Sequence, residues 1–334
     1  MYLCRNLSLD YNFLMITRRI LRIKVMQALY AFFQSGSERV DIAEKNLLKN
    51  INAIYDLYIY QISYLLEIVD FARENIENSK NKYFPTQEET NPNTRFVDNY
   101  LIRILESNPD YIRKRDALKI NWADQKDMIR RNYLQIRETD FFTDYLKFPE
   151  TTDEMDMNVL EAIIDRFITD NEELQQYFEE MNVFWADDFD IACFMLAKTI
   201  KQFKHTNDTI NFLPKLFGNG SESDEKEENK FISDLFCKTI IHRAEFDDMI
   251  ESKVDNWEID RIALMDSLLL KMAITEFVDF STIPTKVTIN EYIDISKMYS
   301  TPKSKIFING LLDKILFDLM EKKKIKKTGR GLIG

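Results

Sequence analysis

Glycine, proline, cysteine and histidine are all scarce in this sequence. Only 7 glycines and 7 prolines interrupt its 334 residues, so it lacks the turn chemistry that folds of many short strands need. The three cysteines, Cys4, Cys193 and Cys237, have no paired spacing, which argues against a disulfide framework and a zinc knuckle. His205 and His242 are the only histidines, so hydrolytic and zinc chemistry lack their usual parts.

Other signatures of enzymes and of membrane proteins are also missing. The sequence contains no glycine-rich phosphate loop, no Gly-x-Ser-x-Gly elbow and no nucleotide fingerprint. Acidic pairs such as Asp187-Asp188 are typical of the surface of so acidic a chain. We therefore predict no catalytic residue, no metal and no cofactor. Every long apolar run is interrupted by charge, and no export signal is found, so we expect a cytoplasmic protein without a membrane partner.

The residues that are abundant predict an all-α fold. Hydrophobic residues make up 45% of the chain and aromatic residues 13%, which is enough for one large core or two smaller ones. Apolar residues recur mainly at helical spacing. The 45 basic and 56 acidic residues give a net charge of -11, so binding to nucleic acid would require a local basic strip.

Composition and periodicity divide the chain into six segments. Residues 218–229 combine glycine, serine and charge with no apolar residue, which predicts a linker. Residues 1–16 lack clear periodicity, and we expect translation to begin at Met15. The predicted segments are an N-terminal extension (1–16), a first helix (17–40), a helical insertion (41–217), the linker (218–229), C-terminal helices (230–321) and a frayed basic tail (322–334).

The insertion contains a strongly acidic stretch. Between Thr151 and Ile191 there are thirteen Asp or Glu residues and one basic residue, Arg166. A solvated acidic face, interleaved with core positions, is the simpler interpretation. The alternative is a docking surface for a basic protein.

The first helix carries the most distinctive pattern of charge. Arg19, Arg22, Met26 and Tyr30 are spaced so that they share one stripe, with Arg18 at its head. Cations in the first turn oppose the helix dipole, at a cost of roughly 0.3 to 1 kcal/mol each. Guanidinium groups followed by a ring on one face are typical of a site for single-stranded RNA. In the structural alternative, the arginines pair with acidic residues of the insertion and Tyr30 belongs to the core.

Two stretches resemble the NusB family. The first is Arg18-Arg-Ile-Leu-Arg-Ile-Lys-Val-Met-Gln-Ala-Leu-Tyr30, which is similar to the opening helix of that family. The second, Trp257 to Ile315, matches in the order and spacing of several pieces. These are Asp260-Arg-Ile262, Ala273-Ile-Thr-Glu276, Ile283-Pro284, Ile289-Asn-Glu291 and Phe307-Ile-Asn-Gly-Leu-Leu-Asp-Lys314.

This resemblance implies both a fold and a function. It implies two small helical bundles packed across one another. It also implies binding of boxA RNA together with the ribosomal protein NusE, in a transcription elongation complex that reads through ribosomal RNA operons. By position, the implied RNA contacts are Arg18, Arg19, Arg22 and Tyr30 on the first helix, and Lys303, Lys305 and Phe307 near the C-terminus. Asp266 lies on the helix through which the family meets NusE, and its carboxylate is implied to bind a basic residue of that partner.

The insertion is the main departure from the family pattern. It leaves the second helix of the family unassigned, and its acidic stretch could cover the basic stripe or recruit another protein. Two alternatives to the antitermination function are a helical interaction scaffold that does not bind RNA and a remnant of an accessory domain of an RNA methyltransferase. The chain lacks the cofactor loop that methyl transfer requires, which argues against the second.

Overall fold

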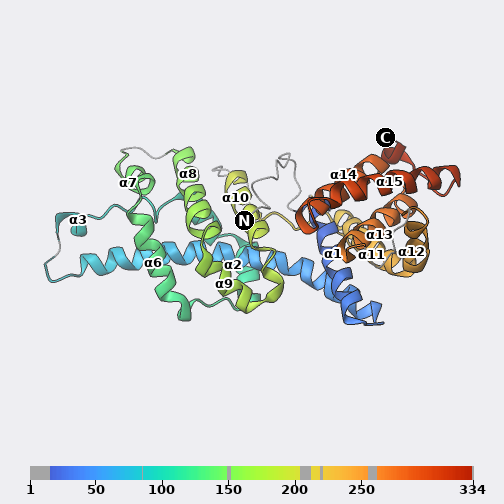
Figure 1. Cartoon of the computed structure of the whole chain (residues 1–334). Coiled ribbons are helices and arrows are strands. Elements are labelled where there is room, and N and C mark those ends of the chain that lie inside the picture. The colour runs from blue at the N-terminus through green and yellow to red at the C-terminus, as the bar shows by residue number, and fades with distance from the viewer. Residues whose placement is uncertain are drawn as a thin grey trace. The chain divides into compact units, whose positions relative to one another are not determined.

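The computed structural model describes residues 16–84, 86–148, 152–203, 212–218, 221–254 and 262–332. Within these ranges the chain is helical and contains no β-strand, which confirms the predicted all-α class. It divides into two compact units (Figure 1). Unit 1 comprises Asn52–Asn219, and unit 2 comprises Ile16–Ile51 with Gly220–Gly334. In the described ranges, no helix combines the length and the apolar character needed to cross a membrane.

Unit 2 is built around α13 (Leu264–Asp279), which is apolar on most of its faces. Such a helix must be covered on all sides, and five other helices contact α13. They are α1 (Arg18–Ser35), α11 (Glu222–Ile241), α12 (Arg243–Glu251), α14 (Thr285–Tyr299) and α15 (Ser304–Glu321). A short 3-10 turn, η5 (Gly329–Leu332), follows.

The helix α2 (Val40–Lys80) contributes to both units. Its 41 residues include no glycine and no proline, and apolar positions such as Leu47, Ile51 and Ile54 continue at helical spacing. The predicted insertion starts at residue 41, but the division between the units falls after Ile51, within this helix. The start of α2 thus supplies unit 2 with a second helix, which the resemblance left unassigned.

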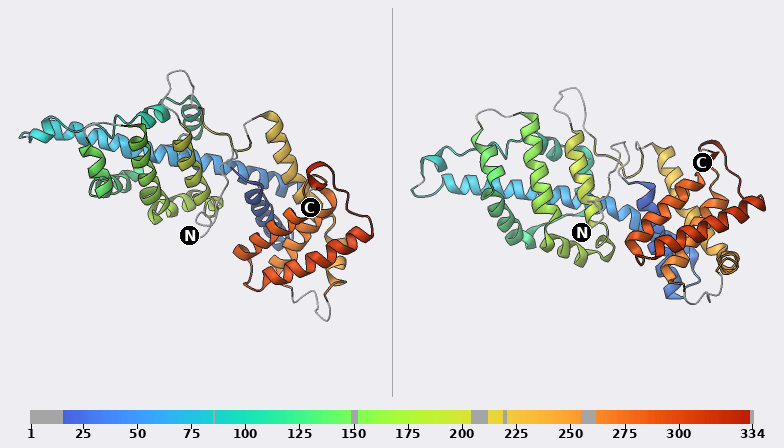
Figure 2. Two further views of the ribbon diagram at one scale, coloured as in Figure 1. Left: turned by 90° about the horizontal axis from the view of Figure 1, so that it is seen from above. Right: turned by 45° about the horizontal axis from the view of Figure 1, so that its top comes forward.

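Unit 1 consists of the remainder of α2 and a series of shorter helices (Figure 2). Buried residues of α2, including Tyr58, Gln61 and Tyr64, bond to side chains or carbonyls of α10 and α6. The elements are α3 (Gln87–Thr90), α4 (Tyr100–Glu106), α5 (Pro109–Leu118), η1 (Ala123–Gln125), α6 (Lys126–Arg137), α7 (Asp140–Lys147), α8 (Asp153–Ile163), η2 (Ile164–Thr169), α9 (Glu172–Met181), η3 (Val183–Trp185) and α10 (Phe189–Gln202).

The predicted linker at 218–229 is wrong over most of its length, because α11 begins at Glu222. Ser221 caps this helix by accepting a hydrogen bond from the backbone N–H of Asp224 at 3.1 Å. Glu222, Asp224 and Glu225 lie in its first turn, where negative charge is favourable to the helix dipole. The absence of apolar residues at the start of α11 therefore reflects a solvated helix turn and not a flexible linker.

The prediction of a frayed basic tail is also wrong for residues 322–332, called the C-terminal strap below. The Lys327 ammonium donates to the backbone carbonyls of Glu276 and Phe280, at 3.0 and 2.8 Å. These carbonyls belong to the end of α13, where a cation is favourable. The backbone N–H of Thr328 donates to the Ser281 carbonyl at 2.9 Å. The strap is therefore pinned along the end of α13.

The first helix ends inside the predicted first segment, 17–40. α1 closes at Gly36, whose φ of 61° is the left-handed conformation that glycine adopts without strain. Residues 1–15 lie outside the described residues, and so does the prediction about Met15.

Candidate nucleic-acid interface

The arginines of α1 lie on different faces of the helix. Its buried side includes Ile20, Leu21, Val25 and Leu29, which pack into unit 2. Arg22 lies on this buried side and is only 3% exposed. Arg18 and Arg19 lie at the edges of the buried side and are partly exposed. The predicted stripe is thus not one continuous solvent-facing surface.

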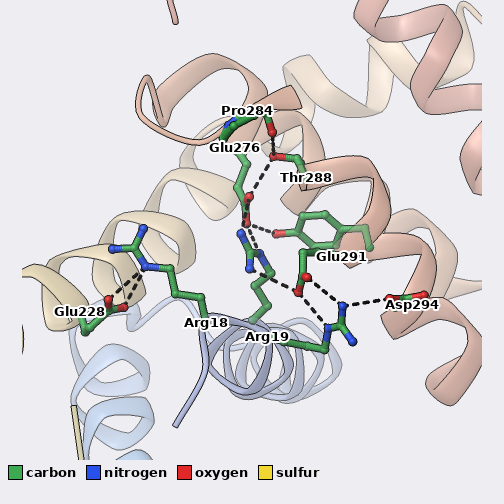
Figure 3. A network of polar contacts seen from close by, with 10 residues as sticks. Arg18, Arg19, Glu228, Glu276, Pro284, Thr288, Glu291 and Asp294 are labelled. Atoms are coloured by element: carbon green, nitrogen blue, oxygen red, sulfur yellow. Dashed lines mark hydrogen bonds and ion pairs between the residues drawn. The ribbon is translucent and has the colours of Figure 1, made fainter. Parts of the chain in front are cut away.

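Arg22 forms the centre of a buried polar network with Glu276 of α13 (Figure 3). Its Nε donates to Glu276 Oε1 at 2.6 Å, and its Nη2 donates to Oε2 at 3.0 Å. The Glu276 side chain is fully buried. Two hydroxyls of α14 also donate to this carboxylate, Tyr292 at 2.9 Å and Thr288 at 3.1 Å. Every member of the network has a partner, as burial of charge requires.

The network keeps the guanidinium charged. Burial alone would lower the pKa of Arg22, but the charge and hydrogen bonds of Glu276 outweigh burial and raise it above its ordinary value. Burial, together with the charge of Glu276, raises the pKa of Tyr292 well above its ordinary value, so this hydroxyl stays protonated and donates. The Arg22–Glu276 contact is therefore a buried ion pair.

Arg18 and Arg19 are also paired with carboxylates of unit 2. Arg18 Nη2 lies 2.6 Å from Glu227 and its Nε lies 3.1 Å from Glu228, both on α11. Arg19 Nη2 lies 2.8 Å from Glu291 and 2.9 Å from Asp294, both on α14 (Figure 3). A hydrogen bond with Glu291 is the main cause of a raised pKa of Arg19.

The three guanidinium groups thus face five carboxylates, those of Glu227, Glu228, Glu276, Glu291 and Asp294. All five belong to α11, α13 and α14 of unit 2, and none belongs to the insertion that the structural alternative invoked. The head of α1 is consequently neutralised from within its own unit. Tyr30 is 41% exposed, so this ring is not a core residue.

The start of α15 presents a different arrangement. Lys303 and Lys305 are exposed, and no carboxylate of the described residues forms an ion pair with either of them. Ser304, between them, is buried, which anchors the turn. Phe307, one helical turn after Lys303, is half-buried. Two exposed cations and a ring therefore lie at one helix end.

Asp266 holds that turn in place from inside unit 2. It is buried, and its carboxylate accepts hydrogen bonds from the hydroxyls of Ser300 and Ser304, the latter at 2.7 Å. These serines flank the connection from α14 to α15. Asp266 thus positions Lys303 and Lys305, and its carboxylate is not turned outward toward a partner protein.

The structure does not join the two groups of predicted residues. Within the ranges that are described, no hydrogen bond, ion pair or ring contact links the α1 residues Arg18, Arg19, Arg22 and Tyr30 to Lys303, Lys305 or Phe307. The sequence interpretation missed the carboxylates that neutralise α1. Glu276 could have been suspected, because an acidic residue within so apolar a helix must have a buried partner.

Comparisons with known proteins point to one family. The sequence model of the NusB family matches residues 191–317. The transcription antitermination protein NusB of Salinibacter ruber is 47% identical over 111 residues, which are 33% of this chain and 69% of that protein. The proteins of the same name from Chloroherpeton thalassium and Natranaerobius thermophilus are 40% identical over 103 residues and 38% identical over 95 residues. These cover 31% and 27% of this chain, and 49% and 68% of those proteins.

No solved structure matches the chain. The sequence similarity is nevertheless sufficient, since the chain covers more than two thirds of two relatives at 38% identity or more. The residues matched by the family model run from α10 of unit 1 into α15, and they include the helices of unit 2 that supply Glu276 and the start of α15; Arg22 on α1 lies outside them. This chain belongs to the NusB family.

Proposed function

We propose that this protein is a transcription antitermination factor that binds single-stranded RNA of the boxA type through the start of α15. The observation that carries the proposal is the pair Lys303 and Lys305, exposed and not ion-paired among the described residues of an otherwise acidic chain. A phosphate backbone is bound by cations that can exchange counterions for phosphates. Phe307 beside them offers a ring on which a base can stack.

The role of α1 in the proposal is narrower than the sequence pattern suggested. Arg22 is buried and holds Glu276, so it supports the fold of unit 2 and does not contact RNA. Arg18, Arg19 and Tyr30 remain candidates for the edge of the site, because their side chains are partly exposed. An RNA phosphate would compete there with Glu227, Glu228, Glu291 and Asp294.

The proposal includes the partners that the family resemblance implies. In it, the protein acts in the cytoplasm with the ribosomal protein NusE and joins a transcription elongation complex on ribosomal RNA operons. Asp266 serves this function indirectly, through the serines that position Lys303 and Lys305. Contact between α13 and NusE stays a prediction.

The test is titration of a labelled boxA-type RNA with the full chain, with and without NusE, over a series of salt concentrations. The logarithm of affinity should fall with the logarithm of salt by about 0.7 per phosphate neutralised. We expect Lys303→Gln with Lys305→Gln to weaken binding and to lower this slope by about 1.4. The matched control is Lys45→Gln with Lys49→Gln, which removes two exposed lysines of α2 and should leave the slope unchanged. Wild-type protein that ignores the RNA even with NusE would refute the proposal.

A helical interaction scaffold without RNA binding is the second candidate. The neutralised head of α1 favours it, because the residues most similar to the family's first RNA contact are already paired. A scaffold would bind NusE with equal affinity in the presence and absence of RNA. The same titration therefore separates the two functions.

A further inference from the structure

The C-terminal strap carries a second cluster of cations. Lys322, Lys323, Lys326 and Arg330 are all exposed. Within the described part of the chain, no carboxylate forms an ion pair with any of the four, whereas Lys324 pairs with Glu245 at 2.8 Å. The sequence model of the NusB family ends at residue 317, so the strap lies beyond the matched region. In a chain of net charge -11, such a cluster forms a local positive surface that attracts a polyanion.

The backbone of the strap is fixed at its beginning by the end of α15. The N–H of Lys324 donates to the Leu319 carbonyl at 2.9 Å, and the N–H of Lys323 donates to the Met320 carbonyl at 3.0 Å. These are the two bonds of a Schellman motif, in which the residue after the C-cap adopts the left-handed conformation. Lys323 occupies this position with φ of 51°, where glycine would be unstrained. Lysine is less favourable than glycine at this position, and it adds one more positive charge to the strap.

The strap is fixed again further along its length. Lys327 binds the two carbonyls at the end of α13, and Thr328 binds the Ser281 carbonyl. Gly331 lies so close to Ser281 that a Cβ atom would stand 2.1 Å from the carbonyl oxygen. A side chain at Gly331 would thus push the strap away. The backbone that carries the exposed cations is held in place by these anchors, so binding orders little additional chain.

The strap and the start of α15 lie at opposite ends of one helix. Lys303 and Lys322 flank the 18 residues of α15, so they are separated by about 28 Å along its axis. The side of α15 between them is uncovered: Ile306 is 73% exposed, Phe317 is 63% exposed, and a Cβ atom added at Gly310 would meet nothing within 4 Å. These three residues share one helical face by their spacing. A single strand could follow this face from one cluster to the other.

We infer that the C-terminal strap is a second phosphate-binding surface, which holds single-stranded RNA that extends beyond the start of α15. This inference rests on the proposed function and adds a surface to it. RNA is favoured as the polyanion because the strap follows the helix whose start is the proposed RNA site. Binding at both ends of α15 makes the second contact intramolecular, which raises the affinity for a long strand over that for a short one.

The experiment compares two boxA-type RNAs, of about 8 and about 24 nucleotides, on the full chain over a series of salt concentrations. We expect Lys322→Gln, Lys323→Gln and Lys326→Gln together to weaken binding of the longer RNA about tenfold or more and to lower its salt slope by about 2. Binding of the shorter RNA should not change. The control Lys45→Gln with Lys49→Gln should bind both RNAs as the wild type does.

Two further variants separate loss of charge from loss of structure. Lys323→Gly removes one cation and the backbone strain, so we expect a higher midpoint of thermal unfolding together with weaker binding of the longer RNA. Gly331→Ala keeps every charge but displaces the strap, so it should weaken binding of the longer RNA while the salt slope changes little. If unfolding caused the weaker binding, the midpoint of thermal unfolding of Lys323→Gly would fall together with its affinity for the longer RNA.

The outcomes distinguish this inference from the proposed function. If the wild type binds both RNAs and the triple variant binds them with unchanged affinity and slope, the strap is not an RNA surface and the proposed function stands. If the wild type binds neither RNA, with or without NusE, both fail. If the triple variant loses binding of the short RNA as well, the strap does not act as a separate second surface, and the inference fails.

Discussion

The two units solve the problem of buried polar groups in different ways. Unit 2 buries a charged pair, Arg22 with Glu276, surrounded by the hydroxyls of Thr288 and Tyr292. Unit 1 also buries the carboxylates of Asp156 and Asp188, but its buried hydrogen bonds at Trp122 and Tyr58 join neutral groups. The Trp122 indole N–H donates to Ser63 at 2.9 Å, and Tyr58 lies 2.6 Å from the Thr199 hydroxyl.

The rings of unit 1 contribute a further difference. Trp122 packs against Tyr60, Tyr64, Tyr177 and Phe178, with ring centroids 5.2 to 6.3 Å apart. Such pairs stabilise by dispersion and by area removed from water, and they tolerate small displacements. A buried ion pair stabilises only when both partners are present. We therefore expect the stability of unit 1 to fall in proportion to the side-chain volume that a substitution removes from its core. The stability of unit 2 should fall abruptly when one partner of its buried ion pair is removed.

The charged core also connects distant parts of the sequence. Arg22 and Glu276 are 254 positions apart, so the pair joins α1 to the C-terminal helices across the whole of unit 1 in sequence. Because the bonds are bidentate and directional, they specify the orientation of α1 on α13. Apolar contacts alone would define that orientation less sharply.

Replacement of Arg22 tests this comparison most severely. Arg22→Met keeps the volume but leaves the Glu276 carboxylate buried without its counter-charge, so we expect unit 2 to lose about 3 to 5 kcal/mol of stability. Hydrogen exchange followed by mass spectrometry should show faster exchange in α13 and α14, with protection retained in α10. Adding Glu276→Gln to Arg22→Met should restore part of the lost stability.

The reciprocal variant is Trp122→Ala in unit 1. Truncation of a buried Trp lowers stability by about 3 to 5 kcal/mol. We expect the amides of α6 and α10 to lose their protection from hydrogen exchange in this variant. If either variant accelerates exchange to the same extent in both units, their cores do not respond separately. The comparison between them would then be wrong.

Two tyrosines offer a finer test. Tyr292 and Tyr58 are both fully buried, but Tyr292 donates to a carboxylate and Tyr58 bonds to a neutral hydroxyl. Tyr292→Phe should cost about 1.5 to 3 kcal/mol and Tyr58→Phe about 0.5 to 1.5 kcal/mol, since a hydrogen bond to a charged group is worth more. Urea unfolding of the two variants measures both values. Equal losses would show that the charge of Glu276 adds nothing to its hydrogen bond.

The sequence was sufficient for the fold class and for the family. Scarce glycine and proline with apolar residues at helical spacing predict helices, and this is a local property of the chain. The family resemblance likewise rests on residues that are close in sequence, such as the run from Phe307 to Lys314. Both were confirmed.

The exposure and the partners of the predicted site residues were less predictable. Whether Arg22 faces solvent or Glu276 depends on a contact between α1 and α13, which helical spacing cannot specify. The exposure of Asp266 likewise depends on a contact between helices. Its carboxylate accepts hydrogen bonds from Ser300 and Ser304 because α13 packs against α15. The sequence predicted a frayed basic tail because Lys327 is anchored by two backbone carbonyls, and a pattern of side chains does not reveal such contacts.

The strap adds a pH dependence to unit 2, which is the smallest effect predicted here. Burial lowers the pKa of Lys327 from its ordinary value of 10.5 to about 8, against an opposing influence of the Glu276 charge. Between these two pH values the unfolded chain keeps a proton at Lys327 that the folded chain has released. The unfolded state then binds more protons, so this residue makes stability rise with pH through the window from about 8 to 10.5.

Other groups titrate in the same window with the opposite sign. Burial, aided by the charge of Glu44, raises the pKa of Cys237 from 9.0 to about 11, so the folded chain keeps that proton longer and stability falls as pH rises there. The contribution of Lys327 is therefore isolated by the difference between two proteins. Relative to Lys327→Met, which keeps the apolar stem, the wild type should gain stability from pH 8 to pH 10.5, with a slope of at most one proton. Urea unfolding at several pH values measures this difference, and parallel profiles for the two proteins would mean that Lys327 titrates in the folded chain as it does in the unfolded one.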